Sequence, residues 1–329
     1  MRQPRVRVAA LTVGIVVVAA GAMAVTAQGP VLQTVEVEST AVKRTMRYNI
    51  VLPQGYDSSS QRYPVLYLLH GLGGNYSDWG ALGAPFYARL YGALIIVMPD
   101  GGNSWYVNYS ESEDEQANNW EDWIVEDMIG HVDTNFRTID RREGRAISGL
   151  SMGGFGAIAL GLRHPDMFAA IGSTSGALEY ASRAAERLRS GSGRPTPELS
   201  PREQALRDRF QQSPNPVIGV DDFDSQAERT PNGTPFVTAE DADAYDPFTL
   251  VLQIPKGQLP HIYLDCGTED RLIDGAVRFA QLLTEERIPF EFMQLHGGHN
   301  GAYWTRSLGH IVAGQYEVMR RQLGERPDR

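Results

Sequence analysis

The chain has 329 residues, of which 42% are hydrophobic, and it carries a formal net charge of −10 with an isoelectric point near 5.2. This length and apolar content suffice for a large buried core, and α/β folds of this size often form one domain. The acidic balance excludes a broad basic surface for a phosphate backbone, so we expect no nucleic-acid partner.

The N-terminus has the layout of an export signal. Arginines at positions 2, 5 and 7 precede an uncharged, largely apolar stretch over 8–27. The small residues that end at Ala27 predict cleavage there, which would leave a mature chain that starts near Gln28 and is secreted or periplasmic. The alternative is an uncleaved membrane anchor, because about 20 apolar residues can span a bilayer. We expect no stable membrane partner unless the signal is uncleaved.

The chain has a single cysteine, Cys266. An intramolecular disulfide, a cysteine-based metal cluster and a lipoprotein anchor are therefore excluded. Its apolar neighbours favour a small core residue over a nucleophile.

The predicted elements alternate along the chain. Residues 31–53 alternate between apolar and polar, which predicts two half-exposed strands at an antiparallel sheet edge. Apolar runs at 65–69, 93–98 and 145–148 are typical of strands buried on both faces, and helical spacing predicts helices over 120–136 and 152–162. Further strands at 169–171, 261–266 and 289–295, a helix over 273–286 and a terminal helix from about Trp304 follow. This order predicts an α/β fold with a mainly parallel central sheet and helices on both faces.

Residues 178–246 interrupt this pattern with glycine- and proline-rich turns and mixed charges. We interpret the segment as an insertion over the C-terminal edge of the sheet, within a single catalytic domain that starts at residue 28. It is either a cap that shapes a substrate cleft or a surface excursion without function.

A G-x-S-x-G motif lies at 149–153, between a predicted buried strand and a predicted helix. This is the context of a nucleophile elbow, in which a tight turn raises the serine above the sheet at a helix N-terminus. Ser151 is therefore the predicted nucleophile. The alternative is a chance glycine- and serine-rich turn without catalytic function.

A serine nucleophile needs a histidine base, which in this fold follows the last strand. His299 lies in the glycine-rich loop after the strand that ends near residue 295, and it is the predicted base. His296 is the local alternative, and a metal site at His296 and His299 lacks an evident third ligand. The remaining histidines considered are interpreted as packing or surface residues: His131, His164 and His310.

The acid of a catalytic triad is expected after the preceding strand, where Asp265, Glu269 and Asp270 are the candidates. Asp265 lies within the predicted strand, whereas Asp270 follows the turn at Gly267 and can meet the distal nitrogen of His299. Asp270 is therefore favoured, and the other two remain alternatives.

The glycine-rich loop over 69–74 follows an early central strand, where backbone amides can turn into the cleft. We predict an oxyanion hole from the amides of Leu72 and Met152, against the alternative of a plain turn. A second loop, over 99–109, also leaves a strand at its C-terminal end, where ligands bind in such sheets. Its aromatic residues Trp105, Tyr106 and Tyr109 are candidate substrate contacts or simple packing. The tryptophans Trp79, Trp120 and Trp304 are better explained as core or rim packing.

With these motifs in place, the chain from about Tyr48 to Tyr303 resembles the esterase D and feruloyl esterase group of the α/β-hydrolase superfamily. That group also contains acetylxylan esterases, S-formylglutathione hydrolases and mycobacterial mycolyltransferases. The resemblance rests on the segments 63–71, 149–154, 267–270 and 297–300. It implies that Ser151, Asp270 and His299 are catalytic, that Leu72 and Met152 are the oxyanion donors, and that neither metal nor organic cofactor is needed. Residues 178–246 match no pattern of the group.

The sequence therefore predicts an exported serine carboxylic-ester hydrolase that forms an acyl-enzyme on Ser151. Export disfavours the cytosolic S-formylglutathione hydrolase activity and favours small or polysaccharide-linked esters, such as feruloyl or acetylated xylan. Two alternatives are an acyltransferase with a sugar hydroxyl as acceptor and a secreted binding protein without catalysis.

Overall fold

The computed structural model describes residues 31–112, 117–191 and 229–325. Among these residues, eight strands form one sheet in the order β1-β2-β4-β3-β6-β7-β9-β10. Their bounds are β1 Val31–Ser39, β2 Arg44–Leu52, β3 Val65–Leu69, β4 Ile95–Pro99, β6 Arg145–Leu150, β7 Ala170–Thr174, β9 His261–Gly267 and β10 Phe290–Leu295. Strand β2 pairs antiparallel with β1 and β4, and the other neighbours are parallel. The predicted mainly parallel sheet with an antiparallel edge is confirmed.

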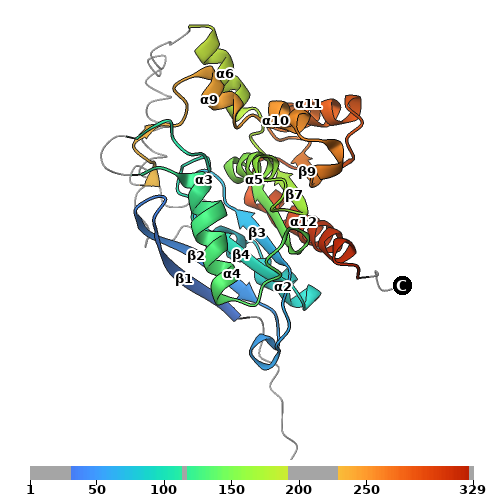
Figure 1. Ribbon diagram of the computed structural model, residues 1–329. Helices are drawn as coiled ribbons and strands as arrows, with labels where there is room; N and C mark the ends of the chain where they lie inside the picture. The colour runs from blue at the N-terminus through green and yellow to red at the C-terminus, as the bar shows by residue number, and fades with distance from the viewer. Residues whose placement is uncertain (1–30, 113–116, 192–228, 326–329) are drawn as a thin grey trace, which may run out of the picture.

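Helices cover both faces of this sheet (Figure 1). Strand β3 shows why, since Val65, Tyr67 and Leu69 enter one core cluster whereas Leu66 and Leu68 enter the other. The first cluster includes residues of α3 Trp120–Asp122, the π-helical segment η2 Trp123–Met128, α4 Ile129–Asn135, α5 Met152–Arg163, α10 Pro247–Gln253 and α11 Ile273–Glu285. The second includes residues of α1 Asp78–Ala81, α2 Ala84–Tyr91 and α12 Gly301–Gln322. Alternate apolar side chains thus bury each strand from both sides.

Several elements differ from the predictions in their details. The helix expected over 120–136 contains the π-helical turn η2, and α2 and α10 were not predicted. The terminal helix starts at Gly301 rather than near Trp304, because the Asn300 side chain accepts a hydrogen bond from the Tyr303 amide and caps it. The described residues also contain five short elements: η1 Tyr56–Ser58, β5 Glu111–Ser112, η3 Arg142–Gly144, β8 Gly233–Thr234 and η4 Lys256–Gln258.

The two described ends of the predicted insertion carry α6 Tyr180–Arg189 and α9 Ala239–Asp243. These helices lie side by side at one end of the molecule, next to α5 (Figure 1). A small core cluster, which includes Ala181, Ala242 and Phe155, joins them to α5. The middle of the insertion, 192–228, lies outside the described residues, as does the predicted signal at 1–27. None of the helices in the described ranges combines the length and apolarity needed to cross a membrane.

Candidate active site

Ser151 lies at the turn between β6 and α5. Its φ and ψ angles are 54° and −115°, a region that residues other than glycine rarely adopt. The neighbouring glycines make this turn sterically feasible. A Cβ at Gly149 would lie 2.2 Å from the Gly153 carbonyl oxygen, and a Cβ at Gly153 would lie 2.4 Å from the Leu69 carbonyl oxygen. The motif therefore folds as a strained strand-to-helix turn with the serine at the helix N-terminus.

The three predicted triad residues meet at this turn, although they come from three different segments. His299 Nε2 lies 2.9 Å from Ser151 Oγ, and His299 Nδ1 lies 2.9 Å from Asp270 Oδ2. With Asp270 as a carboxylate, His299 donates its Nδ1 hydrogen to it and accepts the serine hydroxyl hydrogen at Nε2. The Trp304 indole packs edge-on against the His299 ring, with centroids 5.0 Å apart. This arrangement is competent for removal of the serine proton.

Asp270 is 2% exposed. Burial by itself would raise the pKa of this carboxyl group, but hydrogen bonds from His299 and from the Leu272 amide outweigh it and lower the pKa. Asp270 is therefore a carboxylate at neutral pH, as the acid of a catalytic triad has to be.

The two alternative acids lie elsewhere. Asp265 is buried in β9 and accepts hydrogen bonds from the hydroxyl groups of Thr174, Tyr303 and Ser307, and burial raises its pKa. Glu269 is exposed and lies 3.8 Å from the side chain of His296, which is itself 82% exposed. Among the described contacts, neither carboxylate touches His299, so the geometry favours Asp270.

The other histidines considered make packing or surface contacts. His131 lies 2.9 Å from the Tyr48 hydroxyl, His164 lies 2.6 Å from Glu121, and His310 is exposed on α12. His70, which the sequence reasoning did not single out, is fully buried at the start of the predicted oxyanion loop.

The His70 side chain orients the Gly71–Leu72 peptide. Its Nε2 accepts a hydrogen bond from the Gly101 amide at 2.9 Å, so its Nδ1 carries the hydrogen and donates to the Gly71 carbonyl oxygen at 2.8 Å. A trans peptide points its N–H away from its C=O, so the Leu72 amide faces away from His70. A Cβ at Gly71 would lie 3.3 Å from Ser151 Cβ, which places this peptide beside the nucleophile. Met152 is the first residue of α5, where helix amides have no partner within the helix.

A cavity of about 380 Å³ is lined by neighbours of the triad residues, although the three triad side chains themselves are not part of its lining. It is lined by Ala177, whose amide donates to the Ser151 carbonyl oxygen, and by Arg271, which follows Asp270. Trp105 and Tyr180 form one wall with their rings stacked 3.6 Å apart. Since Tyr180 belongs to α6, the predicted insertion contributes directly to this cavity.

A known protein family matches most of the chain, including the residues of this site. A family model named "Esterase", described as "Putative esterase", matches residues 39–314. The chain belongs to this esterase family. This confirms the family that the motifs at 149–154 and 297–300 indicated.

Relatives within this esterase group are distant in sequence. An esterase of Mycobacterium tuberculosis is 28% identical over 275 residues, which cover 80% of this chain and 54% of that protein. The chain thus spans about half the length of that relative. An acetyl esterase of Caldicellulosiruptor saccharolyticus is 26% identical, and the match covers 80% of this chain and 85% of the relative. A solved ferulic acid esterase shares the fold with a TM-score of 0.65 and 22% identity, over 88% of this chain and 100% of that one.

The aromatic residues of the loop over 99–109 differ in their surroundings. Trp105 lines the cavity, but Tyr106 is 1% exposed and donates its hydroxyl hydrogen to the His70 carbonyl oxygen. The prediction of Tyr106 as a substrate contact is therefore corrected to a packing role behind the predicted oxyanion loop. Tyr109 is half-buried against the core and is not among the cavity-lining residues. Both Trp105 and Tyr106 have positive φ angles, which turn successive side chains in directions that no periodicity predicts.

The remaining predicted core residues are buried. Trp79, Trp120 and Trp304 are each less than 10% exposed, although Trp304 also contacts the catalytic histidine candidate. Cys266 is buried in β9, and burial raises the pKa of its thiol to about 12. A thiol with this pKa is a poor nucleophile at neutral pH.

Proposed function

We propose that the chain is an exported serine carboxylic-ester hydrolase that acts through an acyl-enzyme on Ser151. The observation that carries the proposal is the hydrogen-bonded series Ser151, His299 and Asp270, with 2.9 Å at each step. Membership of the esterase family supports the reaction class. Export rests on the N-terminal pattern alone.

The first half-reaction follows from this geometry. His299 removes the hydroxyl proton of Ser151 while Oγ attacks the ester carbonyl carbon, and negative charge develops on the carbonyl oxygen. The amides of Leu72 and Met152 are the proposed donors to that oxygen. As the tetrahedral intermediate collapses, His299 returns the proton to the departing alcohol, and the acyl group stays on Ser151.

Water completes the cycle in the second half-reaction. His299 takes a proton from the water molecule that attacks the acyl carbonyl, and then gives it to Ser151 Oγ as the acid leaves. Asp270 remains a carboxylate throughout and stabilises the charged imidazole. A sugar hydroxyl in place of water would give the acyltransferase that the sequence left as an alternative.

The cavity beside the triad is the proposed site for one side of the ester. At about 380 Å³ it lies near the lower end of small-molecule sites, which span roughly 300–1,000 Å³. Its aromatic wall of Trp105 and Tyr180 suits a short or aromatic group. Acetylated or feruloylated polysaccharide is therefore the proposed substrate class. The names of an acetyl esterase and a ferulic acid esterase among the similar proteins agree with this choice.

A substrate screen tests this proposal. The chain from Gln28 would be assayed on p-nitrophenyl esters of increasing acyl length, methyl ferulate and acetylated xylan, with and without a sugar acceptor. We expect hydrolysis of the short or aromatic esters and labelling of Ser151 by a fluorophosphonate. Equal labelling of the wild type and of Ser151→Ala would contradict the serine mechanism, and activity on long acyl chains alone would contradict the substrate class. Acyl transfer to the sugar at the expense of hydrolysis would favour the transferase.

A further inference from the structure

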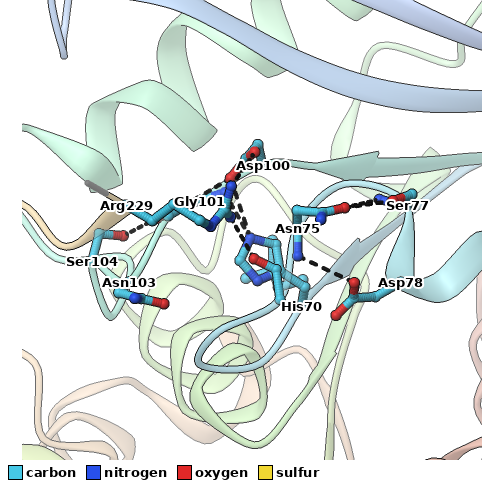
Figure 2. Close-up of polar contacts among 12 residues, drawn as sticks. His70, Asn75, Ser77, Asp78, Asp100, Gly101, Asn103, Ser104 and Arg229 are labelled. Atoms are coloured by element: carbon cyan, nitrogen blue, oxygen red, sulfur yellow. Dashed lines mark hydrogen bonds and ion pairs between the residues drawn. The ribbon is translucent and has the colours of Figure 1, made fainter. Parts of the chain in front are cut away.

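Arg229 lies behind the predicted oxyanion loop, at the start of the second described part of the insertion. Its guanidinium contacts both oxygens of Asp100, with Nη2 2.9 Å from Oδ1 and Nη1 3.3 Å from Oδ2 (Figure 2). The same Nη2 group donates a hydrogen bond to the Gly74 carbonyl oxygen. The Arg229 side chain is 8% exposed and that of Asp100 is 14% exposed. One buried side chain thus joins the end of β4 to the loop that contains Leu72.

A second connection runs through Asn103, which Figure 2 places beside Arg229. The Asn103 amide donates to the Arg229 carbonyl oxygen at 3.0 Å, and its side-chain amide donates to Thr230 Oγ1 at 3.1 Å. The side-chain oxygen of Asn103 accepts the Gly73 amide hydrogen at 2.8 Å. Gly73 and Gly74, which directly follow Leu72, are therefore each held by a group tied to the Arg229 segment.

The charges of this cluster depend on Arg229. Burial alone would raise the pKa of Asp100, but the positive charge of Arg229 outweighs burial and lowers it. Asp78, which is 1% exposed, also interacts favourably with the guanidinium. Arg229 therefore favours the ionised form of Asp100 next to the loop.

We propose that Arg229 is a positioning residue for ester hydrolysis, which fixes the predicted oxyanion loop over 69–74 so that the Leu72 amide points at the developing oxyanion. Through this contact the C-terminal part of the insertion contributes to the rate of reaction, whereas its N-terminal part, with Tyr180, contributes to the cavity wall. The inference rests on the proposed function, because it concerns the oxyanion hole of the same site.

Loss of this contact should affect the transition state more than substrate binding. An oxyanion donor contributes mainly when charge has developed on the carbonyl oxygen, and a small displacement weakens that interaction. We expect Arg229→Met to lower kcat roughly tenfold to a hundredfold while KM changes less than about threefold. Arg229→Lys keeps the positive charge but cannot make the bidentate contact with Asp100, so its kcat should lie between those of Arg229→Met and the wild type.

A double variant separates positioning from folding. Arg229→Met leaves the Asp100 carboxylate without its partner, which lowers stability by itself. Arg229→Met with Asp100→Asn removes both charges of the pair. We expect its thermal midpoint to move back toward that of the wild type while kcat stays low.

Arg163 offers a matched control away from the loop. Its Nε lies 2.9 Å and 3.0 Å from the two oxygens of Glu121, another buried carboxylate. Arg163→Met should lower the thermal midpoint and leave kcat unchanged. Both arginine variants therefore lose a buried ion pair, but only one loses a contact with the oxyanion loop.

The readouts are kcat and KM on p-nitrophenyl acetate, the rate of fluorophosphonate labelling and thermal unfolding. Slow labelling of Arg229→Met and of the double variant, with normal labelling of Arg163→Met, would support the inference. A double variant with wild-type kcat and labelling rate would overturn it while leaving the proposed function intact. A wild type that neither hydrolyses esters nor reacts with the probe would overturn the proposed function, and the positioning role with it.

Discussion

Asp270 and Asp265 lie close together in the sequence, but their surroundings differ. Asp270 faces His299 and has a lowered pKa, whereas Asp265 is held by three hydroxyl groups inside the sheet and has a raised pKa. A carboxylate that stabilises a charged imidazole must itself be ionised, and only the first environment favours ionisation. We therefore propose distinct roles for the two residues, with Asp270 in the reaction and Asp265 in packing.

This contrast predicts different consequences for the two matched substitutions. Asp270→Asn should lower kcat by on the order of a thousandfold or more, because His299 loses the partner that orients it and stabilises its charge. Asp265→Asn should change thermal stability and leave kcat much less affected. Steady-state kinetics and thermal unfolding of both variants measure this. The reverse pattern would identify Asp265 as the acid.

At the scale of elements, the turn between β6 and α5 depends on the absence of side chains at Gly149 and Gly153. A Cβ at either position would approach backbone oxygen atoms that cannot move without displacing β3 or α5. The strain at Ser151 is thus maintained by the packing of neighbouring elements rather than by the residue itself.

We expect Gly149→Ala to lower the free energy of unfolding by about 1–3 kcal/mol and to reduce activity, because relief of the clash would shift Ser151. Gly130→Ala in α4 is the matched control, since a Cβ there meets no atom within 4 Å. That change should stabilise the chain by about 0.5–1 kcal/mol through helix propensity, without any effect on kcat. Urea unfolding and kinetics test both, and a harmless Gly149→Ala would refute the steric argument.

At the scale of the whole molecule, Glu121 connects parts of the chain that are distant in sequence. Glu121 lies in α3 and pairs with Arg163 and His164 at the end of α5. It also accepts a hydrogen bond from Tyr245, which precedes α10. Burial alone would raise the pKa of Glu121, but these partners outweigh it and lower the pKa below its ordinary value of 4.5. The cluster therefore connects the insertion to α5, the helix that follows Ser151.

The lowered pKa sets the direction of a pH dependence. A carboxyl group with a depressed folded pKa contributes stability above its unfolded pKa, and this contribution is lost as the pH falls toward the folded value. Glu121→Gln should therefore lower the free energy of unfolding by about 1–3 kcal/mol at pH 7, with a smaller difference from the wild type below about pH 4. Urea unfolding at several pH values measures this. A difference that does not depend on pH would show that the carboxylate charge is not responsible.

Much of the fold and of the candidate site could be predicted from local sequence patterns. The apolar runs of the buried strands, the glycines around Ser151 and the glycine pair before His299 each reflect a steric or solvation demand that acts within a few residues, so they can be read without a structure. The same reasoning placed Asp270 after its strand. It could not separate Trp105 from Tyr106, because positive φ angles direct one side chain to the cavity and the other beneath the predicted oxyanion loop.

Sequence by itself determined the family, the mainly parallel sheet and the three residues that form the hydrogen-bonded series. Only the tertiary structure decided what surrounds them: the wall that α6 lends to the cavity, the orientation of the Gly71–Leu72 peptide by His70, and the contact of Arg229 with Asp100 and Gly74. Arg229 lies in a segment with no motif, and its partners are more than a hundred residues away in the chain. Nothing local marks such a residue, since its role arises from burial next to two carboxylates that folding brings together.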